Sequence, residues 1–286
     1  PLVVYYNKDI LAAGNFALPP RTWTDVSRAV NLFTKRDIRN NISQSTIALG
    51  ETSNISHFRD ILSAFFIQAG NPIIIDNSTT GIGEAVLASR GRDGVGSLAD
   101  SISFYTAFSN PNNAIYSWNR ALPESIDMFL SGKMAFYIGR ASELFTIQAR
   151  NPNLNFDVIE LFQPDNLVRP LTFGSFIGAG VLKASTNLNT AYAYVASLSA
   201  SKDTVDDLSK RFSLPPVRRD LLLVQQNNPY VSVFFKAALS AFAWPDPNMV
   251  GTEQVFRAMI QDINSGRSDI DTAINEANRN LQSNIR

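Results

Sequence analysis

Residues 1–10 of this sequence read PLVVYYNKDI, and this stretch decides how the rest is interpreted. The run Leu2–Tyr6 is apolar, β-branched and aromatic, which is typical of a buried strand. The polar residues 7–9 end that strand, and a short helix is expected over 10–13, before Gly14. Residue 1 therefore runs directly into what reads as the middle of a hydrophobic core.

The next element is predicted by a helix-capping pattern. Thr22 and Asp25 have the spacing of a capping box, with Asp in place of the usual Glu. Apolar residues then recur at helical spacing: Val26, Ala29, Val30 and Phe33. The first 35 residues therefore predict a strand, a short helix, a proline break and a capped helix.

Similar reasoning places the other elements. Strands are expected where short apolar or alternating runs are bounded by turn residues: 72–76, 134–138, 156–161 and 171–182. Helices are expected over 56–69, 98–108, 123–130, 203–210 and 232–243. A further helix is expected to start after a cap at Asn189, and two more follow from the apolar stripes at 255–263 and 270–281. The glycine-rich stretch 81–96 predicts a loop. Strands separated by helices indicate an α/β fold with short, mostly buried strands.

Composition excludes several functional classes. The 25 basic and 25 acidic residues balance, so no overall field is available to hold nucleic acid or an anionic membrane. The absence of cysteine excludes disulfides and thiolate metal sites, and a zinc site or catalytic triad would depend on the single histidine, His57. The glycines at 81–83 and 91–96 match no phosphate-binding loop. We therefore expect no cofactor and no metal.

Five short motifs carry a family resemblance. They are YYNKD at 5–9, PRTWTD at 20–25, FLSGKMAF at 129–136, LPPVRR at 214–219, and the stretch from INSG to Ala277 over 263–277. Each motif is weak alone, but the set resembles, in order and spacing, the extracellular solute-binding proteins of ABC importers, in the maltose- and oligosaccharide-binding group. The resemblance covers nearly the whole chain.

The resemblance implies a two-lobe, type II periplasmic-binding-protein-like α/β fold, with the opening strand as the first strand of the second lobe. It assigns residues 1–168 and 245–286 to the second lobe and residues 169–244 to the first. About a hundred residues at the start of the family pattern, which build most of the first lobe's sheet, are missing here. Apolar faces left in water cost about 25 cal/mol per Å². We therefore expect an N-terminal segment or a separate chain to cover the first lobe.

In the family the ligand lies in the cleft between the lobes, where aromatic rings stack on sugars and polar groups bind hydroxyls. Trp118 and Trp244 are the candidate stacking residues, although Trp118 could instead pack beneath a helix. Arg140 and Glu143 could bind the ligand by charge or hydrogen bonds, and a solvated helix start is the alternative. Family members commonly carry an aromatic residue where this chain has Ala141, which removes one expected stacking surface.

Four more candidates lie in segments that face the cleft in the family pattern. Asn54 could bind a hydroxyl group, although a helix cap is the stronger alternative. His57 is retained, although a lone histidine is more often a structural hydrogen-bonding residue. Phe173 and Gly174 begin the return strand, where small residues would let backbone groups approach a ligand; Phe173 fits a core position better.

The resemblance implies a binding protein and not an enzyme. Its ligand, by default a sugar or oligosaccharide, would be enclosed by hinge closure and delivered to an ABC permease in the membrane. The location would be extracytoplasmic, which leaves room for a lipid anchor on a segment absent here. Two alternatives stay open: a surface adhesion or scaffold protein that has lost transport, and a carbohydrate-active enzyme with a catalytic carboxylate pair that includes Glu143.

Overall fold

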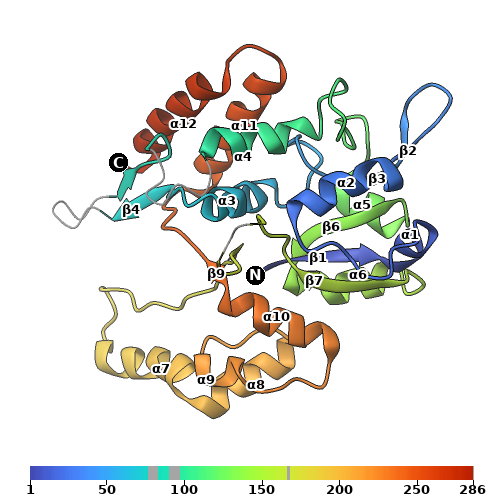
Figure 1. The fold of residues 1–286 in the computed structure, drawn as a ribbon. Helices are drawn as coiled ribbons and strands as arrows, with labels where there is room; N and C mark the ends of the chain where they lie inside the picture. The colour runs from blue at the N-terminus through green and yellow to red at the C-terminus, as the bar shows by residue number, and fades with distance from the viewer. Residues whose placement is uncertain (77–82, 90–96, 166–167, 286) are drawn as a thin grey trace.

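The computed structural model describes residues 1–76, 83–89, 97–165 and 168–285. These residues form a larger body, which holds the main sheet, and a smaller body built from residues 174–240 (Figure 1). The N terminus lies beside the two segments that join the bodies (Figure 1). Within the described residues, no helix combines the length and the apolar character needed to cross a membrane.

The main sheet has the order β2–β3–β6–β1–β7 within the described residues. The bounds of its strands are β1 (Leu2–Asn7), β2 (Lys35–Arg36), β3 (Ile42–Ile47), β6 (Met134–Arg140) and β7 (Phe156–Glu160). Strand β1 is antiparallel to both β6 and β7. Strand β3 is parallel to β6 and pairs with β2 in the antiparallel sense. The opening strand is thus an interior strand of the sheet.

The packing of β1 explains why the sequence opens on apolar residues. Val3, Val4 and Tyr5 are completely buried. Tyr5 lies opposite Tyr137 of β6 and Val158 of β7, and the rings of Tyr5 and Tyr137 stack with their centroids 6.2 Å apart. Such cross-strand pairs stabilise a sheet, so the predicted strand at 2–6 is confirmed.

Helices cover this sheet. They are α1 (Lys8–Ala13), α2 (Trp23–Phe33), α5 (Ser125–Leu130) and α6 (Leu144–Arg150). Helix α1 contacts β6 and β7, α2 contacts β3, and α5 contacts β6. The predicted cap of α2 is confirmed, because the Thr22 hydroxyl accepts a hydrogen bond from the backbone N–H of Asp25 at 3.2 Å.

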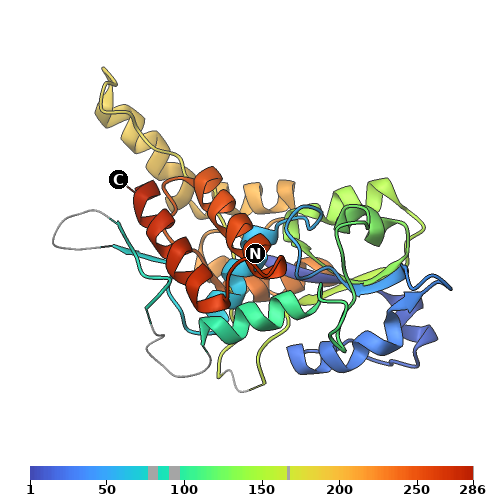
Figure 2. The same ribbon diagram turned by 90° about the horizontal axis from the view of Figure 1, so that it is seen from above.

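A second group of elements packs beside the sheet (Figures 1 and 2). It contains α3 (Phe58–Gln68), α4 (Leu98–Ala107), α11 (Met249–Asn264), α12 (Ile270–Ile285) and the hairpin β4 (Ile74–Asp76) and β5 (Gly83–Ala85). Trp23 of α2 joins this group to the sheet: its ring stacks on Phe65 at 4.5 Å and meets Phe162 edge-on at 5.2 Å. The larger body therefore has one continuous core.

The smaller body is built differently. Its elements are α7 (Leu188–Ala200), α8 (Lys202–Phe212), α9 (Arg219–Leu222) and α10 (Pro229–Leu239), next to the short parallel pair β8 (Thr172–Phe173) and β9 (Ala241–Phe242). Helix α7 buries none of its side chains, and Figure 2 shows it projecting from the rest of the protein. Large apolar side chains stay exposed there: Phe176, Ile177, Leu182, Tyr192, Tyr194 and Phe212. The described residues supply no sheet to cover them.

Several predicted elements differ from the structure. The strand expected over 171–182 is wrong beyond Phe173, since residues 174–182 have no regular structure and contain three glycines. The cap expected at Asn189 is wrong, because the helix begins at Leu188 after Asn187. The helix expected over 232–243 ends at Leu239, and residues 241–242 pair with β8.

The loop expected over 81–96 is also partly wrong, because residues 83–85 form β5 and pair with β4. The rest of that stretch is described only at 86–89, and the glycine pairs considered as phosphate loops lie mostly outside the described residues. The remaining predicted helices and strands are confirmed, with ends that shift by at most three residues, except that α11 begins six residues before its predicted stripe and α12 ends four residues after its own.

Candidate functional site

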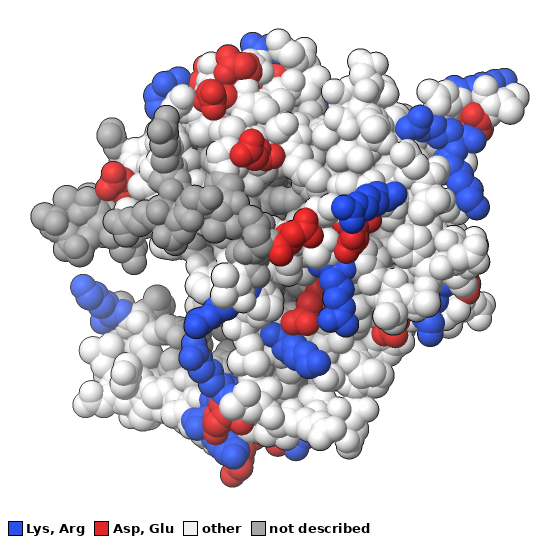
Figure 3. Space-filling model, viewed as in Figure 1, with Lys and Arg blue, Asp and Glu red and all other residues white. Residues whose placement is uncertain are grey.

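Charged side chains gather where the two bodies meet. Figure 3 shows basic and acidic side chains next to one another in the middle of this face, between the larger body and residues 174–240. Three segments supply the central contacts: the start of α3, the end of β6 with the 3-10 turn η1 (Ala141–Glu143), and residues 243–249 before α11. We call the following residues the crossover cluster: His57, Arg59, Asp60, Arg140, Glu143, Trp244 and Asp246.

Asp60 is the centre of this cluster. It lies in the first turn of α3 and is 2% exposed. Its Oδ2 atom accepts hydrogen bonds from Nε and Nη2 of Arg140 at 3.0 and 2.5 Å, and its Oδ1 atom accepts one from Nη1 of Arg59 at 3.0 Å. A buried carboxylate is tolerated when its partners supply charge and hydrogen bonds together. Asp60 therefore fixes both guanidinium groups.

Arg59 links α3 to the segment that returns to the larger body. Its Nη2 atom forms an ion pair with Asp246, and its guanidinium lies 5.3 Å from the ring centre of Trp244. The indole Nε1 of Trp244 donates to Ser63 Oγ at 3.2 Å. Two residues of α3, Arg59 and Ser63, thus hold Trp244 in place. A cation over an aromatic face is attractive. Trp244 is half-buried and lies where the chain returns to the larger body.

Glu143 and His57 form the more open part of the cluster. Oε1 of Glu143 lies 3.1 Å from Nε2 of His57, close enough for an ion pair, although the N–H is not aligned for a regular hydrogen bond. Oε1 also accepts from the Tyr137 hydroxyl at 3.1 Å, and Oε2 accepts from the backbone N–H of Arg140 at 2.7 Å. The side chains of His57 and Glu143 are 21% and 17% exposed, so both remain within reach of solvent.

The pKa of Glu143 decides what this carboxyl can do. Burial alone raises the pKa, but the neighbouring His57 imidazole, together with the donors Arg140 N–H and Tyr137, brings the pKa below its ordinary value. Burial and the Glu143 carboxylate raise the pKa of Tyr137, which stays a neutral donor. A carboxyl with a lowered pKa is a poor proton donor at neutral pH. This carboxyl therefore lacks the raised pKa that the general acid of a glycosidase needs.

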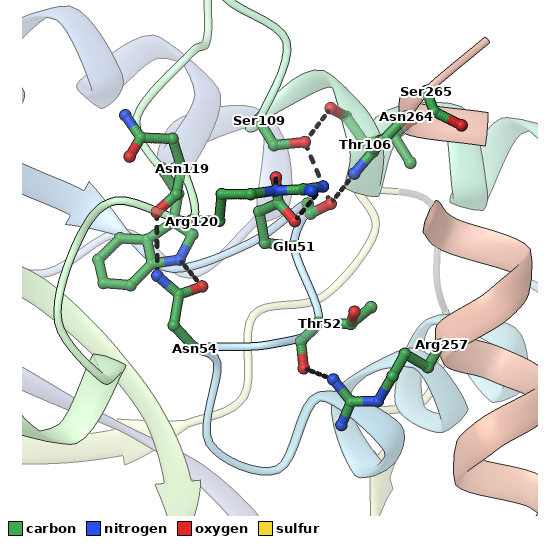
Figure 4. Close-up of polar contacts among 12 residues, drawn as sticks. Glu51, Thr52, Asn54, Thr106, Ser109, Asn119, Arg120, Arg257, Asn264 and Ser265 are labelled. Carbon is green, nitrogen blue, oxygen red and sulfur yellow. Dashed lines mark hydrogen bonds and ion pairs between the residues drawn. The ribbon is translucent and has the colours of Figure 1, made fainter. Parts of the chain in front are cut away.

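The loop between β3 and α3 is held in place by side chains from other segments (Figure 4). Arg120 forms two contacts of 3.2 Å with the Glu51 carboxylate. Arg257 Nη1 donates to the Thr52 carbonyl at 2.6 Å, and Asn264 Nδ2 donates to the Gly50 carbonyl at 2.7 Å. Helix α11 thus fixes the loop that carries His57.

The backbone of this loop has a positive φ angle at both ends. Gly50 has φ of +92°, and a Cβ atom there would meet Ser109 at 2.6 Å, so only glycine fits. His57 has φ of 60°, a left-handed conformation that few residues other than glycine adopt, with histidine among the more frequent of them. Such conformations persist where surrounding contacts impose them and are concentrated at functional sites.

Asn54 and Trp118 lie close together, but inside the protein. Trp118 is completely buried, and its Nε1 donates to Asn54 Oδ1 at 3.1 Å. The Nδ2 atom of Asn54 donates to the carbonyls of Asn119 and Leu122, both at 2.9 Å. Asn54 therefore binds the loop 118–122 instead of capping a helix, and Trp118 has no exposed ring face. Trp118 is therefore a core residue, the alternative given above, and not a residue that stacks on a ligand.

Phe173 and Gly174 are separate from the cluster. Phe173 is 5% exposed and belongs to the core of the larger body. A Cβ atom on Gly174 would meet the Cβ of Ala241 at 2.8 Å, so this glycine permits the close approach of β8 to β9. The Thr172 hydroxyl also donates to the Leu2 carbonyl at 3.0 Å, which joins β8 to β1. Thr172, Phe173 and Gly174 therefore have a structural role where the chain passes between the two bodies.

Of the predicted residues, the structure thus brings together His57, Arg140, Glu143 and Trp244. Sequence reasoning missed Arg59, Asp60 and Asp246. An Arg-Asp pair in the first turn of an otherwise apolar helix was the available signal, since charges at such positions are seldom buried without partners. Among the described residues, no group of three histidine or acidic side chains is placed to hold a metal ion.

The fold is that of a class of protein, the two-lobe solute-binding proteins. A family model described as "Bacterial extracellular solute-binding protein" matches residues 1–234, and the chain belongs to this family. The family is extracytoplasmic. Among curated proteins, none matches the chain.

Solved structures show the same fold. A cyclo/maltodextrin-binding protein complexed with maltotetraose has a TM-score of 0.72 and 18% identity, over 100% of this chain and 68% of the other. An ABC transporter solute-binding protein from Thermotoga lettingae bound to α-D-tagatose has a TM-score of 0.66 and 19% identity, over 100% and 70%. MalE from Bdellovibrio bacteriovorus bound to maltotriose has a TM-score of 0.68 and 14% identity, over 100% and 70%. This chain thus spans about 70% of their lengths.

Proposed function

We propose that this protein binds a sugar or oligosaccharide between its two lobes and delivers it to an ABC permease when the lobes close. The crossover cluster is the observation that carries the proposal, because it combines charged, hydrogen-bonding and aromatic groups where the two bodies meet. The ligands of the similar structures, maltotetraose, tagatose and maltotriose, support carbohydrate as the ligand class. A ligand that contacts both lobes stabilises the closed state, which the permease would recognise.

Each open member of the cluster has a role in this proposal. Arg140 is 44% exposed and uses Nε and Nη2 on Asp60, so its remaining N–H groups can donate to ligand hydroxyls. The Glu143 carboxylate accepts from hydroxyls, and His57 can donate beside it. Trp244 offers an aromatic surface of the kind that packs on a sugar ring. Arg59 and Asp60 hold these groups in position.

The proposal includes the division into lobes. Residues 1–168 and 245–286 would form the second lobe, and residues 169–244 part of the first. The exposed apolar side chains of α7 and of residues 174–187 support a first lobe whose sheet comes from a preceding segment or a separate chain. Helix α10 would be the point of contact between lobes, since Phe234 and Ala237 pack in the core of the larger body.

Tryptophan fluorescence tests the proposal. Trp23 is 7% exposed and Trp118 is completely buried, so Trp244 is the tryptophan that a ligand at the cluster would affect. We expect a saturable fluorescence change on titration with maltotetraose or tagatose. Arg140→Gln should weaken binding about tenfold, the value of one hydrogen bond to a charged group.

Arg150→Gln is the matched control, because Arg150 is similarly exposed and pairs with Asp127 at a different site. Its affinity should equal that of the unaltered protein. The absence of a saturable change with both sugars, or equal affinity in the Arg140→Gln variant, would contradict the proposal.

A further inference from the structure

A depression of about 410 Å³ lies at the opposite end of the main sheet from the crossover cluster. Asn7 at the end of β1 contributes to it, whereas the cluster lies near Leu2, which pairs with Arg140 at the other end of the same strand. Its other walls come from α1, the end of α2, the turn before β6 and the loop 151–155. The depression is therefore distinct from the proposed cleft.

Amide side chains dominate the lining. They are Asn7, Gln44, Asn151, Asn153 and Asn155. One carboxylate, Asp9, and one ammonium group, Lys35, accompany them, so the charges of the lining cancel. Ile10, Phe33 and Leu154 supply apolar surface between the polar groups. A mixed lining of this kind, in a volume of roughly 300–1,000 Å³, is usual for small-molecule sites.

Asn7 is the strongest sign of a binding site. It is 3% exposed, and its Oδ1 atom accepts from the backbone N–H groups of Asp9 and Ile10 at 2.9 and 3.1 Å, which caps α1. Its Nδ2 group forms no hydrogen bond within the described part of the chain. That group points toward Gly132, which also lines the depression: a Cβ on Gly132 would lie 3.9 Å from Nδ2. Because Nδ2 is open to the depression, it is free to donate to a ligand there.

The rim supplies further unused groups. Lys35 and Asn153 are exposed, and neither side chain forms a hydrogen bond or ion pair with another described residue. Asp9 already accepts from Asn155 Nδ2 at 2.6 Å, which leaves its second oxygen available. Donors and acceptors thus surround a common space.

We propose that this depression is a second binding site, for a small neutral polyhydroxylated molecule such as a monosaccharide or a polyol. Gln44, Asn151 and Asn155 already donate one hydrogen bond each inside the protein. An amide has two N–H groups and two lone pairs, so each keeps groups that can pair with a hydroxyl, which also both donates and accepts. The apolar side chains match the C–H faces of such a molecule. A lining without net charge gives no preference for an ion.

Amide chemical shifts measured by NMR test this site, with D-glucose and myo-inositol as separate probes. We expect saturable shifts at residues 7–14, 131–132 and 151–155 with at least one probe. Asn7→Asp keeps the capping oxygen but removes the Nδ2 donor, and it should weaken binding about tenfold. Asn228→Asp is the matched control, because Asn228 caps α10 by accepting from the N–H groups of Tyr230 and Val231. Its affinity should be unchanged.

A double variant, Lys35→Met with Asn153→Ala, provides a second test that leaves the helix cap intact, and it should also weaken binding. The proposal is overturned if neither probe shifts these amides in a saturable way, if the shifts occur only at the crossover cluster, or if both variants bind as the unaltered protein does. These results are independent of the Arg140→Gln titration, so either site can fail alone.

Discussion

The larger body and the segment 174–240 bury apolar residues to very different extents. In the larger body, β1 and β6 are flanked by other strands and covered by helices, and nearly every apolar side chain on them is below 5% exposed. In the segment, α7 has no buried side chain, and Ile177 is fully exposed. Both regions contain helices with side-chain N-caps, α2 in the larger body and α8 and α10 in the segment, so a capped helix alone does not indicate a buried core.

The difference shows what a helix needs from its surroundings. Helix α8 begins with a Ser201 cap and carries ion pairs from Lys210 to Asp206 and from Arg211 to Asp207. Such local contacts contribute only a few tenths of a kcal/mol each. Most helix stability in proteins comes from packing an apolar face. The exposed apolar side chains of the segment support our proposal that further polypeptide covers it.

The largest expected effect concerns the two cores. Phe136 is completely buried in β6 and packs edge-on against Phe33 and Phe162. Phe136→Ala should lower the free energy of unfolding by about 3–5 kcal/mol. Phe176→Ala, at a position 78% exposed, should change it by less than about 0.5 kcal/mol. Urea denaturation measures both, and a large loss at Phe176 would show that the segment has its own core.

Ion pairs should show the same contrast. Asp60→Asn removes a buried carboxylate between Arg59 and Arg140 and should cost about 3 kcal/mol, because two guanidinium groups lose their partner. Asp220→Asn, which removes an exposed pair with Arg218, should leave the denaturation midpoint unchanged. Equal effects of the two variants would remove the special role given to Asp60.

Backbone constraints provide a third, smaller contrast. Gly50→Ala places a methyl group against Ser109 at a positive φ and should cost about 1–3 kcal/mol. Gly180→Ala, in the segment, meets nothing within 4 Å and should be neutral or slightly stabilising. Thermal melting of both variants tests this, and a stable Gly50→Ala protein would contradict the conformation assigned to the loop.

The smallest effect is a pH dependence at the crossover cluster. The pKa of Glu143 is lowered in the folded protein from an ordinary value of 4.5. Its stabilising contribution is therefore complete above about pH 4.5 and is lost as the pH falls through the lower folded pKa. Glu143→Gln should be less stable at neutral pH and should lose less stability on acidification. Denaturation midpoints across this range provide the measurement, and parallel curves for the two proteins would contradict it.

Sequence reasoning predicted elements whose signals are local. The apolar run at 2–6, the Thr22 cap and the stripe of α11 each specify their own structure. Strand β3 was missed, because its sequence ISQSTI has polar residues on both faces, and only pairing with β6 gives it a place in the sheet. The strand expected over 171–182 failed for the opposite reason: its apolar residues have no neighbouring strand beyond β9 in the described chain.

The candidate site was predictable only in part. Trp244, Arg140, Glu143 and His57 lie in separate stretches, and family resemblance was needed to bring them together. Trp118 and Asn54 were misassigned as ligand-binding groups because burial depends on tertiary contacts, here the loop 118–122. Asp60 was missed for the same reason, since its two arginine partners lie on different elements.

Hydrogen exchange tests the central claim most directly, namely that the larger body has a buried core and residues 174–240 do not. Mass spectrometry of this chain should find the amides of β1 and β6 strongly protected and those of α7 and α8 exchanging many times faster, because few buried contacts hold these helices. Protection of α7 and α8 equal to that of β1 would show that residues 174–240 are already a finished lobe and would contradict the account.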